Sequence, residues 1–591
     1  MRKYKIDRCN ECMDMLKKDK NYRNIFRIFC SHETITSVEF KLDGEIKKLS
    51  FADMEFVSEY CGDKIIEILK DVPKGFVCLK LANCPEWFGI FWGILLAGYK
   101  PFLVDARHDE NLTKYFLDES GAVAIISTDN YGFEGVKCVD ANEIIKLGKR
   151  TLLEVSANAD RTSKTREERI MSYDWGDEVA LCTSGTTSTA KIFVYNGETM
   201  ANQIENAREE EFADSNICGD EEKRNLCFLP LNHLFGFMAN YIWFGFFGSS
   251  MVMPDKIAPS VLLSTCRDHH VTHILAVPLL FNNIAKGIKQ KIEKQSKFKQ
   301  FMFNRMLDIS LFAQKIEPNF GISVAKKLFG KSVLSNLAGD DIICLISGGG
   351  HVLPETLRIV NGIGYYTICG FGMTEVGVSS MENRRKIKHR LAGCVGLPCS
   401  SIEYKIVPLN DNDDSVGELV MRGSSIHSAM LKNGGYAPAA VDEEGWFRTG
   451  DIGRLTNGAL YIEGRLKEVI INESGENVYP DELEDMFLGI GGISQFTVLG
   501  IKKSKDSPYE DIVFVGQVAD NVLGDKDKIE KIRLEIAERN GGLPVYKKLG
   551  YILLTADELP LSNGIKIRRA VIKKQVEGGE GNYLKIESLK K

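Results

Sequence analysis

A run of hydroxyl side chains that ends in a lysine is the feature of the sequence most suggestive of chemistry. It comprises Thr183, Ser184, Gly185, Thr186, Thr187 and Lys191. Such a turn, placed after a buried strand, presents backbone N–H groups and hydroxyls to polyphosphate oxygens, and the lysine adds positive charge. It is not a Walker A loop, because no glycine precedes a Lys-Ser/Thr pair at the required spacing. Taken alone, the run is more typical of a Ser/Thr-rich surface turn.

Four further motifs follow this run in order along the chain. They are Phe371-Gly372-Met373-Thr374-Glu375, Arg448-Thr449-Gly450-Asp451, Gly464-Arg465-Leu466-Lys467-Glu468, and Lys566 near the end. In this order the motifs resemble those of the adenylate-forming superfamily, which includes acyl-CoA synthetases, luciferases and peptide-synthetase adenylation domains. Five motifs in one order are far more specific than any one of them. The resemblance covers nearly the whole chain.

The resemblance implies ATP as a substrate and Mg²⁺ as a cofactor. Attack of a carboxylate on the α-phosphate brings two anions together, so such a site must supply cations and hydrogen-bond donors. By resemblance, the 183–191 loop binds the β- and γ-phosphates. Thr374 then hydrogen-bonds the α-phosphate, and Glu375 holds Mg²⁺, which prefers carboxylate and phosphate oxygens. The structural alternatives are a helix N-cap for Thr374 and a first-turn acid for Glu375.

The resemblance also assigns residues to the adenine and acyl pockets. Phe371 takes the position of an aromatic ring that stacks on adenine, and stacking needs only the ring face. Gly372 follows it in the same motif. Gly348, Gly349 and Gly350 resemble the wall between the adenine and acyl pockets, and Gly350 replaces an alanine that is usual there.

Five residues complete the set that the resemblance implies. Asp451 accepts both ribose hydroxyls, and Arg465 closes on the ribose and phosphate. His233 matches a position beside the acyl carboxylate, although a lone histidine there is more often a core residue. Lys566 resembles a mobile catalytic lysine that neutralises charge in the transition state. Lys467 lies at the family's hinge, where rotation exchanges the adenylation site for a thioester-forming one.

Parallel sheets are the elements that must position these residues. Residues 75–128 alternate between strand-length and helix-length segments, which predicts a βαβαβ unit with strands at 76–81, 101–104 and 122–126. A second series of buried strands is predicted, around residues 180–182, 226–228, 274–276, 342–346 and 365–368. A polar stretch, 157–169, is expected to be a surface connection. We therefore predict an α/β fold with a doubly wound body.

The sequence after Tyr404 changes character. Short strands punctuated by glycine, such as 417–421 and 458–462, predict a small β-rich unit, and an α+β segment follows. We expect an ATP- and acyl-binding domain over residues 1–466. We expect a mobile C-terminal lid over residues 467–591.

Composition excludes several functional classes. The 591 residues are 44% hydrophobic and carry 75 Lys+Arg against 81 Asp+Glu, so the chain is globular with no electrostatic footprint for nucleic acid. The start of the chain lacks a secretory signal, so we expect a cytoplasmic protein whose thiols are reduced. The uncharged stretch 234–254 is broken by glycines, which favours a helix and a strand over a membrane span.

Two groups of residues have the side-chain types of metal ligands, but neither forms a complete ligand set. Cys9 and Cys12 have ligand spacing, but no second CxxC pair completes a zinc site. His269, His270 and His273 precede an apolar strand and have no carboxylate at ligand spacing. We expect these histidines to be structural.

A lysine-rich helical insertion runs from Phe281 to Asp340. Residues 286–299 contain six lysines and a single acidic residue, Glu293. Such a face is either solvated or in contact with an anionic membrane surface. The insertion resembles that of long-chain fatty acyl-CoA synthetases.

The leading prediction is a long-chain acyl-CoA ligase that works through an acyl-adenylate. No phosphopantetheine site follows Lys566, so we expect a free thiol such as CoA as acceptor. Two alternatives keep the half-reaction: a ligase that loads a separate carrier protein, and a ligase for a shorter or aromatic acid. A luciferase-type activity shares every motif. A non-catalytic nucleotide-binding regulatory protein is disfavoured, because the chain retains Lys191, Glu375, Asp451 and Lys566. A serine hydrolase is disfavoured, because the sequence has no Gly-x-Ser-x-Gly elbow.

Overall fold

The computed structural model describes most of the chain, in two compact units. The described residues are 2–159, 164–183, 190–213, 217, 222–330, 333–334, 337–410, 413–471, 477–502, 509–562, 566–587 and 589. Unit 1 comprises residues 1–404 and 421–447, and unit 2 comprises residues 405–420 and 448–591. The predicted boundary after residue 466 stays a prediction.

The predicted βαβαβ unit is confirmed within an eight-stranded sheet of unit 1. Its parallel strands are β3 (Phe76–Lys80), β4 (Lys100–Leu103) and β5 (Ala124–Ser127), joined by α4 (Pro85–Leu96) and α5 (Glu110–Ser120). The sheet order is β19-β18-β8-β7-β4-β3-β5-β6. The remaining strands are β6 (Lys137–Asp140), β7 (Glu178–Cys182), β8 (Ile192–Asn196), β18 (Ala429–Lys432) and β19 (Gly435–Ala437).

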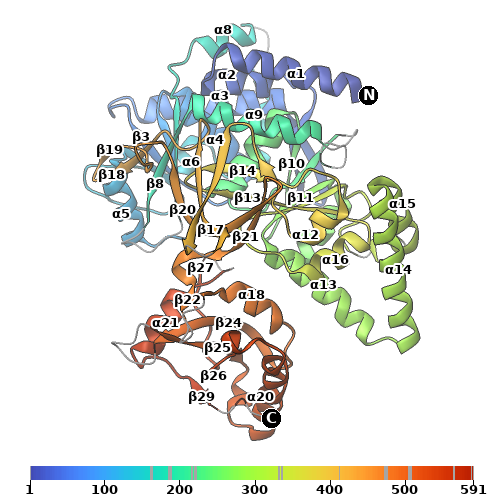
Figure 1. The fold of residues 1–591 in the computed structure, drawn as a ribbon. Coiled ribbons are helices and arrows are strands. Elements are labelled where there is room, and N and C mark those ends of the chain that lie inside the picture. The colour runs from blue at the N-terminus through green and yellow to red at the C-terminus, as the bar shows by residue number, and fades with distance from the viewer. Residues whose placement is uncertain are drawn as a thin grey trace. The chain divides into compact units, whose positions relative to one another are not determined.

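The second predicted series of strands builds mostly a nine-stranded sheet, also in unit 1 (Figure 1). Its order is β15-β14-β13-β12-β11-β9-β10-β1-β2, and β11, β12 and β13 run parallel. The strands are β1 (Thr36–Leu42), β2 (Glu45–Ser50), β9 (Arg224–Leu226), β10 (Ser250–Met253), β11 (His273–Ala276), β12 (Cys344–Ser347), β13 (Tyr366–Met373), β14 (Gly377–Met381) and β15 (Leu397–Pro398).

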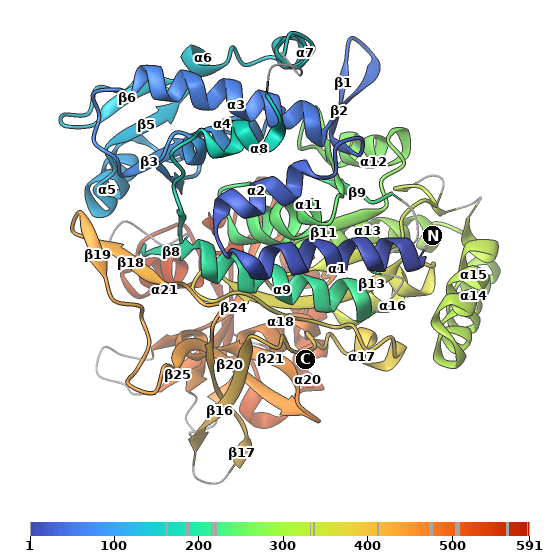
Figure 2. The same ribbon diagram turned by 90° about the horizontal axis from the view of Figure 1, so that it is seen from above.

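Helices cover the sheets of unit 1, and α1 lies alongside α9 (Figure 2). Those not yet named are α1 (Arg2–Lys18), α2 (Tyr22–Cys30), α3 (Phe51–Ile68), α6 (Ala141–Ile144), α7 (Lys149–Ala157), α8 (Arg166–Met171), α9 (Gly197–Ala213), α12 (Pro259–Asp268), α13 (Pro278–Glu293), α14 (Lys297–Ile316), α15 (Pro318–Phe329), α16 (Pro354–Gly362) and α17 (Ile387–Leu391). The predicted surface connection is exposed or half-buried over residues 164–169, and a capping box between Thr165 and Glu168 starts the short helix α8 inside it.

The stretch 234–254 divides into helix and strand as predicted. The helical part is a π-helix, η1 (Phe235–Trp243), followed by a short α11 (Phe244–Phe246), and β10 comes next. Among the described residues, no helix is both long and apolar enough to span a bilayer. Long π-helices are rare and often accompany functional sites.

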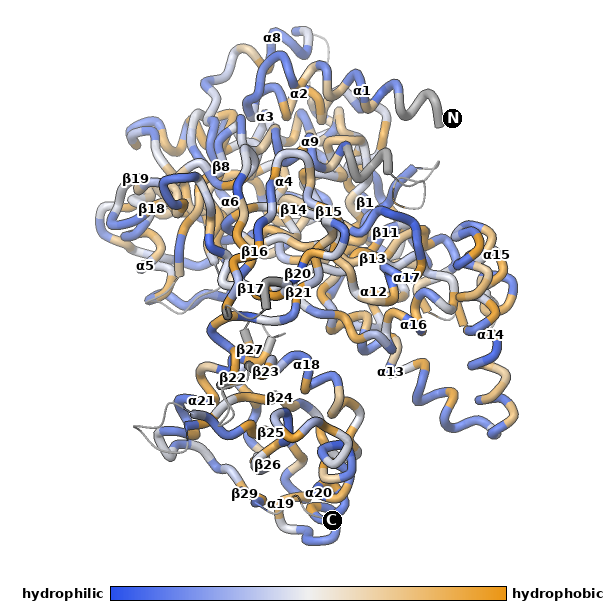
Figure 3. The backbone as a smooth tube through the Cα atoms, viewed as in Figure 1, coloured by the Kyte–Doolittle hydropathy of each residue, from blue (hydrophilic) through white to orange (hydrophobic). Residues whose placement is uncertain are grey.

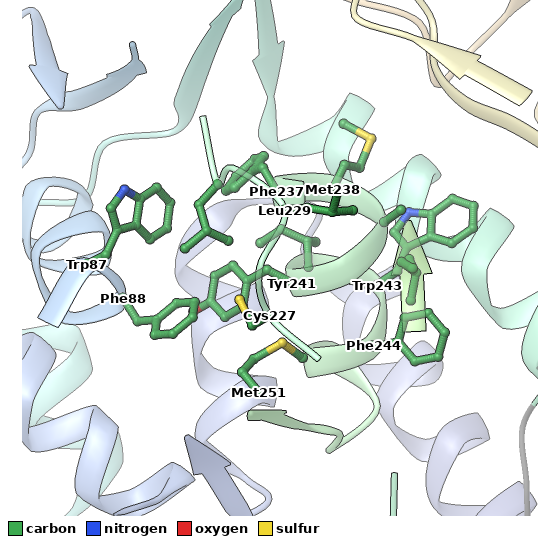
Figure 4. Packing of buried hydrophobic residues seen from close by; sticks show 14 of the residues in the cluster. Trp87, Phe88, Cys227, Leu229, Phe237, Met238, Tyr241, Trp243, Phe244 and Met251 are labelled. Carbon is green, nitrogen blue, oxygen red and sulfur yellow. The ribbon is translucent and has the colours of Figure 1, made fainter. Parts of the chain in front are cut away.

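Aromatic packing between α4 and η1 forms the centre of the core of unit 1. Tyr241 lies 4.5 Å from Phe88 between ring centroids (Figure 4). Its hydroxyl accepts a 2.6 Å hydrogen bond from the Trp92 indole. Glycines let α3 approach α4 closely: a Cβ at Gly89 would lie only 2.7 Å from the Val57 side chain. The core therefore holds η1 firmly against α4.

Unit 2 contains the β-rich part and the α+β part that the sequence predicts. The β-rich sheet has the order β16-β17-β20-β21, and the α+β sheet has the order β24-β25-β26-β29. The main elements are β16 (Ile402–Asn410), β17 (Asp413–Gly423), β20 (Phe447–Thr456), β21 (Ala459–Arg465), β24 (Ile493–Lys502), β25 (Glu510–Val518), β26 (Tyr551–Thr555), β29 (Leu584–Ile586), α18 (Pro480–Met486), α20 (Lys526–Gly541) and α21 (Arg569–Glu577). Smaller elements are β22 (Ile470–Ile471), β23 (Asn477–Val478), β27 (Leu561–Ser562), β28 (Lys566–Ile567), α19 (Asp520–Leu523) and the 3₁₀ turns at 466–468 and 545–547.

Candidate active site

The glycine turn after β12 lies at the carboxyl end of the parallel strands. Ser347 of β12 is the register partner of Cys369 of β13, so β13 continues beyond Cys369 beside this turn, where it pairs with β14. Ligands bind at such sheet edges in α/β folds. Gly349 has a φ of +77°, and a Cβ at Gly348 would lie 3.1 Å from the Phe235 ring. Glycine therefore lets the turn approach η1 closely.

Phe371, Gly372, Thr374 and Glu375 lie on a hairpin between β13 and β14. These strands are antiparallel, with a bulge between Phe371 and Gly372. Thr374 and Glu375 form the turn of this hairpin. A helix N-cap at Thr374 is therefore wrong, because the chain returns as a strand rather than starting a helix.

Three buried side chains that sequence reasoning missed hold this turn. Tyr195 donates its hydroxyl to the Thr374 carbonyl at 2.9 Å. Gln203, fully buried on α9, donates to the Val376 carbonyl at 3.1 Å and accepts from the Val378 N–H at 3.2 Å. The third residue is His427.

His427 contributes through its neutral form. Its Nε2 accepts from the Ala440 N–H at 3.0 Å, which leaves Nδ1 to donate to the Glu375 carbonyl at 2.5 Å. Burial lowers the pKa of His427, in keeping with a neutral ring. No local motif marks these residues, since each reaches the turn from a distant part of the chain.

A pocket of about 180 Å³ joins this hairpin to the glycine turn. Its lining is mostly apolar and comes from η1 with the residues on either side of it, from β11, β12, β13 and β14, and from the turns after β12 and β13. The lining residues are His233, Leu234, Phe235, Ala239, Trp243, Phe244, Leu275, Ile346, Ser347, Gly348, Gly349, Gly370, Phe371, Gly372, Met373, Thr374, Val378, Ser380 and Met381. The predicted Gly350 adjoins the lining but is not part of it.

Three polar atoms of the lining residues are buried without a hydrogen-bond partner in the described part of the chain. They are Trp243 Nε1, Ser347 Oγ and Ser380 Oγ. Such orphan groups cost free energy unless a water or a ligand satisfies them. These three atoms are enclosed by the residues that line the pocket, and the surface that the pocket presents is mostly apolar.

His233 lies at the pocket beside a carboxylate that sequence reasoning missed. Its Nε2 is 3.5 Å from Asp105 Oδ2, and Asp105 also accepts from both Nε and Nη2 of Arg107. Burial by itself would raise the pKa of Asp105, but these hydrogen bonds outweigh it and hold the pKa well below its usual value. The signal for Asp105 was its position two residues after β4, at the carboxyl end of a parallel strand.

The hydroxyl-rich run is described only at its two ends. β7 and β8 are antiparallel, and Cys182 pairs with Ile192. Thr183 donates its N–H to the Lys191 carbonyl at 2.9 Å, and the Lys191 N–H donates to Thr183 Oγ1 at 3.0 Å. The predicted phosphate-binding residues between them, Ser184, Gly185, Thr186 and Thr187, lie outside the described residues.

Unit 2 brings the predicted ribose-binding pair together. Asp451 on β20 is the register partner of Arg465 on β21, and Arg465 Nε lies 3.1 Å from Asp451 Oδ1. Thr449 Oγ1 accepts the Asp451 N–H at 3.0 Å and donates to the Leu419 carbonyl at 2.7 Å. The β-hairpin thus holds the carboxylate in a defined place.

The predicted hinge and catalytic lysines lie on separate segments of unit 2. Lys467 is exposed in a 3₁₀ turn (Leu466–Glu468). Lys566 pairs with Ser562 in the short hairpin of β27 and β28, and its side chain lies outside the described part. Arg569, three residues later, is buried and forms ion pairs with Glu468, Asp481 and Glu484. This cluster connects the two lysine-bearing segments.

Metal ligands are sparse in the described residues. No group of three or more His, Cys, Asp or Glu side chains there could hold a metal ion. Mg²⁺ in nucleotide sites takes one or two carboxylates and completes its shell with phosphates and water. Glu375, in the hairpin turn, offers one carboxylate of this kind.

The histidine cluster is structural, as predicted. His269 Nδ1 lies 2.7 Å from Glu39 in the core, and His273 hydrogen-bonds the Ile217 carbonyl at 2.6 Å. His270 pairs with Asp341 near the surface at 2.9 Å. The described cysteines are free thiols.

Comparison with known proteins gives one family and several distant relatives. The family model "AMP-binding enzyme" matches residues 36–430. A chloroplastic long-chain-fatty-acid–[acyl-carrier-protein] ligase of Arabidopsis thaliana is 24% identical over 73% of this chain, and the match spans 64% of that relative, less than two thirds of its length. A long-chain-fatty-acid–CoA ligase of Salmonella typhimurium is 25% identical over 86% of both chains.

The solved structures agree on the fold. The O-succinylbenzoate coenzyme A synthetase of Bacillus subtilis, in complex with ATP and magnesium ion, superimposes with a TM-score of 0.64 at 18% identity. The superposition covers 93% of this chain and 99% of that one. The α/β fold is therefore that of adenylate-forming enzymes, as predicted.

Proposed function

The chain belongs to the AMP-binding enzyme family, and from this premise we propose that it activates a long-chain fatty acid with ATP. The reaction forms an acyl-adenylate and pyrophosphate, and transfer to CoA gives the thioester. The acid's carboxylate attacks the α-phosphorus, the bond to the pyrophosphate oxygen breaks, and the CoA thiol then displaces AMP from the acyl carbon. ATP and CoA are co-substrates, with Mg²⁺ as cofactor.

The observation that carries this proposal is the shared pocket. Phe371 and Thr374, assigned to adenine and the α-phosphate, line the same pocket as the apolar residues of η1, such as Ala239 and Trp243. A nucleotide and an apolar acid can therefore meet there.

Each motif has a role in the proposed reaction. Residues 183–191 hold the β- and γ-phosphates, Thr374 holds the α-phosphate, and Glu375 holds Mg²⁺, which neutralises phosphate charge when bound. His233 lies beside the acyl carboxylate. The hydrogen bonds from Tyr195, Gln203 and His427 support the roles of Thr374 and Glu375, because they fix the backbone of the turn that carries both residues.

The remaining roles belong to residues of unit 2. Asp451 binds the ribose hydroxyls, with Arg465 closing on the ribose and phosphate. Lys566 neutralises charge as the carboxylate attacks. Lys467 is the hinge for the change from adenylation to thioester formation.

The acceptor has a second candidate. The Arabidopsis relative is named as an acyl-carrier-protein ligase, which favours a carrier protein as the alternative to CoA. We further propose a cytoplasmic protein that works at a membrane surface, because a long-chain acid partitions into lipid.

The test is pyrophosphate release with ATP, Mg²⁺ and a panel of acids from acetate to oleate. Each acid is run alone, with CoA and with a pantetheinylated carrier protein. We expect sustained release on long chains that depends on CoA. Pyrophosphate release that increases only with the carrier protein would identify that protein, rather than CoA, as the acceptor. The absence of release with every acid would overturn the proposal that the chain is an enzyme.

A further inference from the structure

Helix α14 carries an exposed apolar stripe, which we define as Phe298, Phe301, Met302, Ile309, Phe312 and Ile316. Phe298 is 71% exposed, Phe312 65% and Ile316 68%. These spacings of three, four and seven residues place the side chains on one helix face. Phe320, at the start of α15, is exposed as well. Isolated exposed apolar residues are ordinary, but an aligned set of this size marks an interaction surface.

The stripe is not a misassigned core face. The opposite side of α14 is buried through Phe303, Leu307 and Ser310. Gln314, also buried, donates to the Asn361 carbonyl at 2.7 Å. α14 and α15 lie side by side at the margin of unit 1 in both ribbon views, and hydrophobic residues recur along both helices (Figures 1, 2 and 3). The core requirements of α14 are therefore met by its other face.

The stripe lies in a strongly basic segment. Residues 286–316 contain eight Lys or Arg against two acids, Glu293 and Asp308. Asp308 is neutralised by Arg358 at 2.7 Å. Arg305 lies within the stripe with its guanidinium 5.2 Å from the Phe301 ring.

Two lysines beside the stripe are not neutralised by a described carboxylate of the chain, so their charges can interact with a partner. Lys297 and Lys315 are exposed and make no salt bridge to any described carboxylate. Apolar side chains bordered by such cations match the boundary of an anionic bilayer, where the chains enter the acyl region and the cations meet headgroups. A second copy of this chain fits poorly, because its own basic segment would repel the first.

We propose that the α14 stripe docks the protein on anionic lipid bilayers, with Lys297, Lys315 and Arg305 facing the headgroups. The docking surface is distinct from the lysine-rich run alone, because the apolar residues lie C-terminal to most of that run. It does not depend on the proposed ligase activity. If that activity holds, docking places the enzyme where long-chain acids partition.

The test is co-flotation of the full chain with vesicles of phosphatidylcholine alone or mixed with phosphatidylglycerol. We expect binding only to the anionic vesicles. The stripe variant Phe298→Ser/Ile309→Ser/Phe312→Ser should lose it, and the charge variant Lys297→Glu/Lys315→Glu should weaken it by more than about twentyfold, at about fivefold per lost cation. The matched control Lys256→Glu/Ile257→Ser changes an exposed lysine and an exposed isoleucine elsewhere in unit 1 and should bind like wild type.

Further measurements keep the outcomes distinct. Circular dichroism checks that the variants fold, and pyrophosphate release tests the ligase proposal separately. A tryptophan at Phe312→Trp should be quenched by brominated lipids in anionic vesicles. Absence of wild-type flotation, equal binding by the stripe variant, or a concentration-dependent dimer that the stripe variant abolishes would overturn the membrane proposal.

Discussion

Gln203 connects three parts of unit 1 through one buried amide. It donates to the carbonyls of Val376 and Ser425 and accepts from the Val378 N–H. A Cβ at Gly377, whose φ is +78°, would lie 2.0 Å from this amide, so the turn needs glycine there. Gln203 is thus a positioning residue for Thr374 and Glu375.

Removing this amide should affect both stability and turnover. In Gln203→Met the buried backbone groups lose their partners, which should lower the free energy of unfolding by about 1–3 kcal/mol. We expect kcat for pyrophosphate release to fall more than KM for the acid changes. The exposed control Gln295→Met should leave both values unchanged. A stability loss with an unaltered kcat would remove Gln203 from the positioning of the turn.

Ala239 is the smallest side chain that η1 contributes to the pocket. A phenyl ring in its place occupies volume in a pocket of about 180 Å³. Ala239→Phe should therefore reduce kcat/KM for long-chain acids by at least about tenfold, because pocket volume sets chain discrimination. Activity on the shortest accepted acid provides the internal control. An equal loss on all acids would mean that the apolar pocket does not hold the acyl chain.

At the scale of elements, His32 connects the end of α2 to α11. Its Nε2 hydrogen-bonds the Phe246 carbonyl at 2.9 Å, and burial lowers its pKa to about 4. The folded state therefore binds fewer protons than the unfolded state between pH 6.5 and 4. Protonation of His32 in the unfolded state therefore lowers the free energy of unfolding as the pH falls from 6.5 toward 4, and above pH 6.5 this loss is absent.

We expect His32 to account for a loss of up to about 3 kcal/mol in unfolding free energy over that range. His32→Gln should flatten this part of the pH profile measured by urea unfolding. The control His270→Gln changes an exposed histidine and should preserve the slope. An identical slope in the His32 variant would show that other groups carry it.

The Arg569 cluster ties together α18, α21 and the 3₁₀ turn at Lys467. Arg569 Nη2 lies 2.8 Å from Glu484, and its Nε donates to Thr497 at 3.0 Å. Burial raises the pKa of Glu484, so Arg569 is what keeps this carboxylate compatible with its site.

Arg569→Met should destabilise unit 2 by about 3–5 kcal/mol, because it leaves buried carboxylates without a counter-charge. Hydrogen exchange of α18 and α21 should report the loss locally. Lys528→Met removes an exposed ion pair of the same unit and should have no measurable effect. Equal protection in both variants would contradict a structural role for the cluster.

At the scale of the whole molecule, the features that depend on short segments could be predicted from the sequence, and the features that depend on long-range contacts could not. The βαβαβ alternation and the five motifs are properties of short segments, and the fold and the pairing of Asp451 with Arg465 follow from them. Tyr195, Gln203 and His427 could not be assigned from short segments. Their roles depend on which distant segments the sheets bring together. The π-helical geometry of η1 has no periodic signature in so apolar a stretch.

Lys566 tests the proposed division of labour across the molecule. Lys566→Ala should abolish adenylation, because the transition state loses its neutralising charge. Thioester formation from supplied acyl-adenylate and CoA should be largely retained. Single-turnover assays of the two half-reactions measure both rates. Loss of both would contradict the assignment of this lysine to adenylation alone.

The central claim is that an acid and ATP form an acyl-adenylate at the pocket beside the Thr374 turn. Exchange of labelled pyrophosphate into ATP, measured without CoA, tests this step most directly. We predict exchange that requires Mg²⁺ and a long-chain acid and is lost in the Lys566→Ala variant. The absence of acid-dependent exchange, or formation of ADP instead of AMP, would contradict the account.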